Sequence, residues 1–83
     1  MIISCFNKRF ETPHGLLSFY FNRIRTDEGL HFHVHFVKGN LAYVFLMVEL
    51  DEQWHLADKH NHPHWLLSME NHFREHIAEH INP

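Results

Sequence analysis

The chain contains one cysteine, Cys5, among its 83 residues, which excludes an intrachain disulfide. No apolar run approaches the roughly 20 residues that a membrane-spanning helix needs. The apolar stretch within Met1–Phe10 is too short for a signal peptide, and Lys8 and Arg9 interrupt it. These absences favour a cytoplasmic protein that has no membrane partner, and the short length predicts one domain over residues 1–83.

A net basic field is also missing. The formal charge is −3 at pH 7, whereas a protein that binds nucleic acid neutralises phosphates with lysine and arginine. We therefore expect no nucleic-acid partner. The eleven histidines would take the net charge from −3 to +8 if all of them were protonated. Solubility and self-association should consequently depend on pH between roughly 5 and 7.

Catalytic signatures are lacking as well. There is no nucleophile elbow, phosphate-binding loop or dinucleotide fingerprint. Adjacent carboxylates occur only in the expected turns, at Asp27-Glu28 and Asp51-Glu52, where solvation explains them. We expect neither enzymatic activity nor an organic cofactor, and no motif identifies a family.

The stretch Leu30–Leu50 is the most informative part of the chain. Its first half alternates strictly between apolar residues and histidine, which is the period of two of a β-strand. Gly39-Asn40 then supplies a two-residue turn of the primed type, since glycine tolerates a positive φ. The second half, Leu41–Val48, is apolar at every position, which predicts a central strand.

A two-residue turn determines the register of this hairpin by counting from Lys38 opposite Leu41. One face then carries the aromatic and aliphatic residues of a core. On the other face, three histidines stand opposite aliphatic residues of the second strand. The expected pairs on that face are His35 with Val44, His33 with Leu46, and His31 with Val48.

The remaining elements complete the predicted fold. Residues 2–10 and 16–25 read as two further strands, and residues 53–57 as a short fifth one. A helix is expected from about His64 to Ile81, with Asn61 as its cap and Pro63 in its first turn. The fold class is therefore α+β: an antiparallel four- or five-stranded β-meander with one C-terminal amphipathic helix packed on one face.

Histidine is the one residue type here whose pattern suggests chemistry. His31, His33 and His35 project from one strand face about 6.6 Å apart along the backbone. Two of them could share a Zn²⁺, Ni²⁺ or Cu²⁺ ion if a third ligand came from elsewhere. Imidazoles packed on a partly buried face are the commoner explanation of such a pattern, so metal binding is an alternative hypothesis.

Two other histidine groups have simpler interpretations. His60, His62 and His64 surround the start of the helix, where exposed imidazoles would bind metal only adventitiously. His72, His76 and His80 recur every four residues along the helix, without the glutamate spacing of a metalloprotease. Helical projection places His80 near the centre of the apolar stripe and His76 on its flank.

The histidine-bearing face of the sheet is also apolar enough to suggest association. A single helix covers one face of a sheet, so this second face should meet something else. We expect a non-enzymatic interaction module that forms a homodimer through this face, with a small hydrophobic ligand held between sheet and helix as a weaker alternative. The expected interface residues are Tyr20, Ile24, His31, His33, His35, Val44, Leu46 and Val48.

Overall fold

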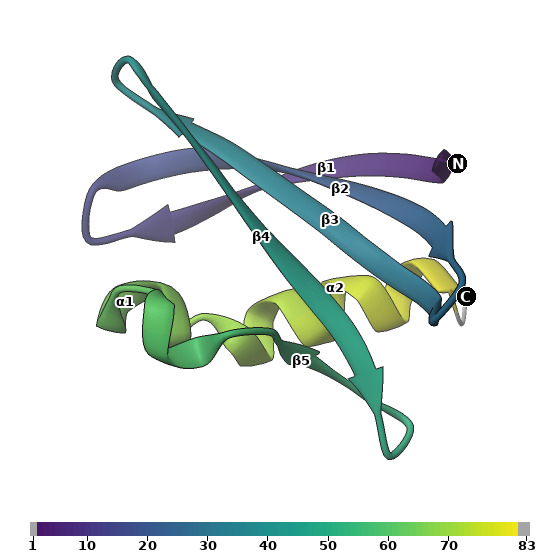
Figure 1. The fold of residues 1–83 in the computed structure, drawn as a ribbon. Helices are drawn as coiled ribbons and strands as arrows, with labels where there is room; N and C mark the ends of the chain where they lie inside the picture. Colours follow the sequence, from purple (N-terminus) through teal and green to yellow (C-terminus); the bar gives the residue numbers. More distant parts are fainter. Residues whose placement is uncertain (1, 82–83) are drawn as a thin grey trace.

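Five antiparallel strands pair in the order in which they follow one another along the chain (Figure 1). The computed structural model describes residues 2–81, with side chains from Cys5 onward. The elements are β1 (Ile2–Thr12), β2 (Gly15–Thr26), β3 (Gly29–Lys38), β4 (Leu41–Leu50), β5 (Gln53–Leu56), the 3-10 helix η1 (Lys59–Asn61), α1 (His64–Leu67) and α2 (Glu70–Ile81). The predicted α+β meander is confirmed, in its five-stranded form.

The predicted register is confirmed in the hairpin of β3 and β4, and β2 pairs with the other edge of β3. Lys38 pairs with Leu41, and His33 pairs with Leu46 on β4 and with Asn22 on β2. Gly39 has a φ of 63°, a backbone conformation that glycine adopts more readily than other residues do. One face of β2, β3 and β4 is consequently lined by residues of alternate positions that are almost completely buried.

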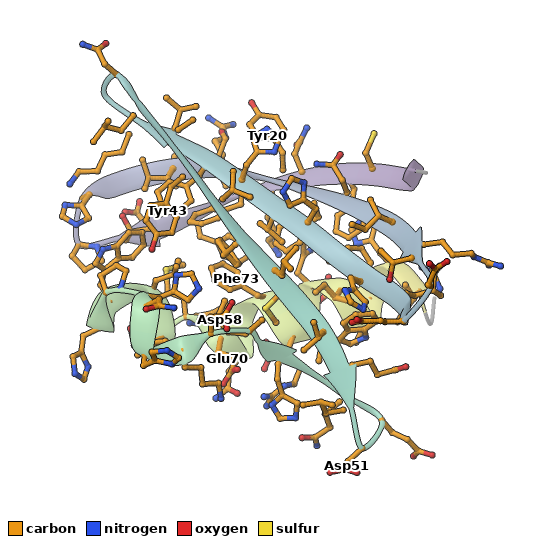
Figure 2. All side chains as sticks on the ribbon, viewed as in Figure 1. Tyr20, Tyr43, Asp51, Asp58, Glu70 and Phe73 are labelled. Carbon is orange, nitrogen blue, oxygen red and sulfur yellow. The ribbon has the colours of Figure 1, made fainter. Side chains whose placement is uncertain are left out.

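The core lies between this face and the C-terminal helices. Phe73 of α2 is fully buried, and its ring centroid lies 5.1 Å from that of Phe19 and 5.2 Å from that of Phe45. In Figure 2, Phe73 points from α2 towards the sheet. Phe6 and Phe10 of β1 pack against the same cluster from the side. Seven of the thirteen buried hydrophobic residues in the described part of the chain are aromatic, and such side chains bury a large area each.

The predicted single helix over residues 64–81 is wrong in one respect, because it is divided at Ser68-Met69. There the Met69 N–H bonds to the carbonyl oxygen of Leu66, three residues back, at 3.0 Å. The Ser68 hydroxyl also donates to the carbonyl oxygen of Trp65 at 2.7 Å. A serine that bonds its own backbone competes with regular helix geometry, which explains the tight turn at this point.

The predicted helix cap is also wrong. Asn61 lies inside η1, and the residue that precedes α1 is Pro63, which makes no side-chain cap. The carbonyl oxygen of Pro63 accepts hydrogen bonds from Leu66 and Leu67. Asp58 starts η1 in the left-handed conformation, with a φ of 52°. The segment between β5 and α1 therefore contains a 3-10 helix rather than an irregular loop.

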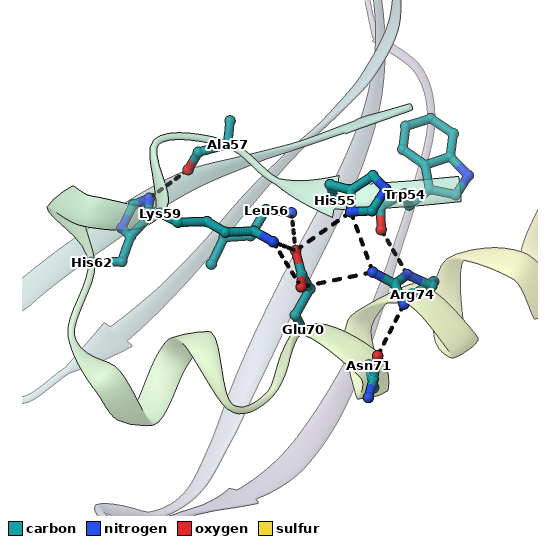
Figure 3. Close-up of polar contacts among 9 residues, drawn as sticks. All are labelled: Trp54, His55, Leu56, Ala57, Lys59, His62, Glu70, Asn71 and Arg74. Carbon is teal, nitrogen blue, oxygen red and sulfur yellow. Dashed lines mark hydrogen bonds and ion pairs between the residues drawn. The ribbon is translucent and has the colours of Figure 1, made fainter. Parts of the chain in front are cut away.

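Two side chains of α2 cover the free edge of β5 (Figure 3). A Glu70 carboxylate oxygen accepts the Leu56 N–H at 2.7 Å, and Arg74 Nε donates to the Trp54 carbonyl oxygen at 2.8 Å. Lys59 Nζ lies 3.0 Å from the same Glu70 oxygen. Backbone groups of an edge strand that would otherwise face water are thereby satisfied by the helix that covers the core.

These contacts also set the ionisation of Glu70. Burial raises its pKa, but the hydrogen bond from Leu56 and the positive charges of Lys59 and Arg74 outweigh that effect, so the pKa lies below 4.5. A carboxylate with a lowered pKa stabilises the fold at pH values above the unfolded pKa. That contribution is lost as the pH falls through the folded pKa.

We predict that Glu70→Gln lowers the free energy of unfolding by about 1–2 kcal/mol at pH 7, because a charged hydrogen-bond acceptor becomes neutral. The deficit should shrink in acid, as the pH falls through the lowered pKa of Glu70 and the carboxylate itself becomes protonated. Urea unfolding at pH 7 and in acid measures both effects. Glu75→Gln, on an exposed position of α2, is the control, and equal stability of the two variants at pH 7 would contradict the role assigned to Glu70.

Candidate functional site

The sheet face that points away from α2 has a central part formed by alternate residues of β2, β3 and β4, called here the outer face. On the same side of the sheet, at the margin, the exposed residues Arg9 and Glu11 of β1 pair with Ser18 and Leu16. Five large hydrophobic side chains of the outer face, those of Leu16, Tyr20, Val37, Val44 and Leu50, are more than 40% exposed. The outer-face positions of these three strands hold no lysine, arginine, aspartate or glutamate. They are Leu16, Ser18, Tyr20, Asn22, Ile24, Thr26, His31, His33, His35, Val37, Ala42, Val44, Leu46, Val48 and Leu50.

The three predicted strand histidines lie in the middle of the outer face, each partly buried by its neighbours. The His35 ring stacks on Tyr20, with centroids 5.0 Å apart and planes 16° from parallel. Beside His33, the Asn22 side-chain amide donates to the His33 carbonyl oxygen at 3.3 Å. His31 stands between Ile24 and Val48 in the sheet register. The eight residues expected at the interface therefore share one surface.

These histidines do not assemble into a metal site in the structure. Within residues 2–81, no three side chains of histidine, cysteine, aspartate or glutamate lie close enough together to hold an ion. Regular strand geometry separates alternate residues by about 6.6 Å, so further ligands would have to come from another element. The metal hypothesis for His31, His33 and His35 thus gains no support from the described residues.

A second histidine group lies on the opposite side of the sheet, under α2. His76 is only 5% exposed and is surrounded by aromatic rings, with centroids 5.1 Å from those of Phe6 and Phe21. His80 stacks on Phe6 at 3.8 Å but remains exposed. The sequence prediction ranked these two residues the wrong way round. The last turn of α2 reaches the edge strand, where little covers it.

The environment of His76 favours its neutral form. Neither ring nitrogen has a hydrogen-bond partner, and the nearest carboxylate oxygen, of Glu79, is 3.9 Å from Nδ1. Burial lowers the pKa of His76 below 6.5, and the positive charges of His80 and Lys8 lower it further against the opposing effect of Glu79. His76 is therefore a core residue whose protonation would place a positive charge among buried aromatic rings.

His62 has a structural role that its exposed-looking sequence context did not reveal. Its Nε2 lies 3.0 Å from the Ala57 carbonyl oxygen, and its Nδ1 lies 2.9 Å from the Tyr43 hydroxyl. A carbonyl oxygen only accepts, so Nε2 carries the hydrogen in the neutral ring and the Tyr43 hydroxyl donates to Nδ1. The Tyr43 ring is thereby held against the start of α1.

An apolar cavity of about 200 Å³ opens beside Tyr43, between the end of the β3–β4 hairpin and α1. The buried ring of Phe36 forms its floor and stacks on Tyr43, with centroids 5.2 Å apart. Trp65 stands edge-on to Phe36, with ring centroids 5.6 Å apart, and its ring also contacts that of His14 at 5.2 Å. The complete lining is Phe36, Lys38, Leu41, Tyr43, Pro63 and Trp65.

Comparisons with known proteins identify no relative. No family model matches the chain, and neither the curated proteins nor the solved structures contain a significant match. Among the described residues, no helix has the length and apolarity required to cross a membrane.

We predict that the stability of the protein falls between pH 7.5 and 5.5 in part through His76. Its pKa is lower in the folded state, so below about pH 6.5 the His76 imidazole binds a proton more readily in the unfolded chain than in the folded one. This costs at most about 1.4 kcal/mol per pH unit. His76→Leu should therefore lose less stability than the wild type in urea unfolding across this range. His60→Leu, an exposed control, should behave like the wild type, and an equal loss in all three proteins would contradict the prediction.

Proposed function

We propose that this protein is a cytoplasmic, non-enzymatic interaction module that forms a homodimer through its outer face. One observation carries the proposal: the outer face exposes apolar side chains and lacks permanently charged ones. Leu16, Val37 and Val44 are 53%, 54% and 49% exposed, and Tyr20 is 41% exposed. On a small protein, an apolar surface of this extent usually marks a site of association.

The absence of charge on the outer face favours a second copy as the partner. A two-fold axis brings residues of one subunit close to the same residues of the other, so permanent charges near the axis would repel. A different protein would normally be selected by complementary charges, which the outer-face positions of β2, β3 and β4 do not offer. Two such sheets can pack face to face about 10 Å apart.

The size of the outer face indicates a weak dimer. One strand of twelve residues and two of ten, at about 3.3 Å per residue and 4.8 Å between strands, project an area of roughly 500 Å². A standard stable interface buries about 800 Å² of accessible surface on each partner. Because side chains roughen the projected surface, the outer face lies near the lower limit of that class, and we expect a dissociation constant in the micromolar range.

The structure favours one of the two other hypotheses, the small-ligand site, over the metal site. A metal-binding role for His31, His33 and His35 lacks a third ligand within residues 2–81 and is not proposed. The small-ligand hypothesis is favoured by a specific observation, the cavity beside Trp65. Both sites can operate in one molecule, since they lie on opposite sides of the β3–β4 hairpin.

We predict that Val44→Glu weakens the dimer at least about tenfold, because it buries a carboxylate on both sides of the contact. Val44 is half exposed, so the subunit should remain folded. Light scattering and sedimentation between about 10 μM and 1 mM measure the effect. Leu41→Glu is the matched control, because it lies on the same strand but faces the other way. A wild-type monomer throughout this range would remove the proposal.

We also predict that association weakens at pH 5.5, where histidine side chains become charged and the two outer faces repel each other. The triple variant His31→Gln, His33→Gln, His35→Gln should associate equally at pH 7.5 and pH 5.5. Circular dichroism at pH 5.5 must show folded protein, so that unfolding through His76 is not mistaken for dissociation. An equally strong pH dependence in the triple variant would assign the effect to other groups.

A further inference from the structure

The cavity beside Trp65 has the walls of a binding site for an aromatic ring. Three aromatic side chains surround it, and Pro63 and Leu41 complete an apolar lining. A cavity of about 150 Å³ with apolar walls is large enough to bind benzene. At about 200 Å³, this one has room for a ring that bears a short substituent.

Contacts within the protein hold the walls of the cavity. The hydrogen bond from Tyr43 to His62, and that from His62 to Ala57, hold the Tyr43 ring in position. Phe36 is 2% exposed and cannot rotate without disturbing the core. The His14 ring packs edge-on against that of Trp65. A site built on locked side chains loses little conformational entropy when a ligand binds.

Lys38 supplies the only charge in the cavity lining. Among the ion pairs of the described residues, none involves Lys38. Its side chain is exposed, and its strand partner at the end of the β3–β4 hairpin is Leu41, which is 74% exposed. The cavity therefore combines aromatic walls with one exposed ammonium group. This combination suits a ligand that has an apolar ring and a negatively charged group.

From this arrangement we infer that the cavity binds a small aromatic carboxylate, with its ring between Phe36, Tyr43 and Trp65 and its carboxylate at Lys38. A ring gains edge and face contacts with three aromatic side chains that a linear aliphatic chain does not gain. The carboxylate stays at the mouth, where it remains hydrated while it pairs with the ammonium group. This binding is independent of the proposed dimer.

The test uses 3-phenylpropionate as the probe, with its neutral amide and hexanoate for comparison. Titration is followed by two-dimensional amide NMR, which locates binding, and a dissociation constant of about 1 mM is expected for a ligand of this size. The acid should bind at least threefold more tightly than the amide and than hexanoate. No shift of the cavity residues at 5 mM probe would overturn the site, and equal affinities of acid and amide would overturn the role of the carboxylate.

Three variants separate this inference from the dimer. Lys38→Gln should bind the acid and the amide equally, and Leu41→Glu should weaken acid binding at least threefold by repulsion. Both positions are exposed, so the fold is not at risk. Val44→Glu should bind the acid as the wild type does. If Lys38→Gln retained the preference for the acid, or if Val44→Glu abolished binding, the assignment of the site would be wrong.

Discussion

The contact between α2 and one face of the sheet organises the whole molecule. Phe73 places its ring among those of the strands, and Glu70 and Arg74 bind the backbone of β5 along the edge. A helix of twelve residues is about 18 Å long and can cover only one face. Because successive strand residues point to opposite faces, the neighbour of each core residue lies on the face that α2 does not cover.

Local patterns were sufficient to predict the sheet. The alternation in Leu30–Val37 and the turn at Gly39-Asn40 determine which residues face each other, and the observed pairs agree from Lys38–Leu41 to His31–Val48. Period and turn length are short-range properties, so a single sequence contains them.

Contacts between distant residues were not predictable in the same way. The role of Glu70 depends on where β5 runs relative to α2, and that of His62 on the position of Tyr43. The division at Ser68-Met69 shifts the helical phase, so a continuous helical projection could not identify His76 as the buried histidine. For the candidate site, the sequence predicted which residues share the outer face, but it gave no sign of the cavity beside Trp65.

The two edges of the sheet differ, and this difference limits how copies of the chain can combine through their backbones. In the described part of the chain β1 pairs only with β2, whereas the edge of β5 is occupied by Glu70 and Arg74. A fibril that grows strand by strand needs two open ends on every subunit. Because the side chains of Glu70 and Arg74 occupy the β5 edge, two subunits could join only through their β1 edges, and no further subunit could be added. The α2 side chains at β5 therefore protect a chain rich in β-structure and aromatic residues against fibril growth.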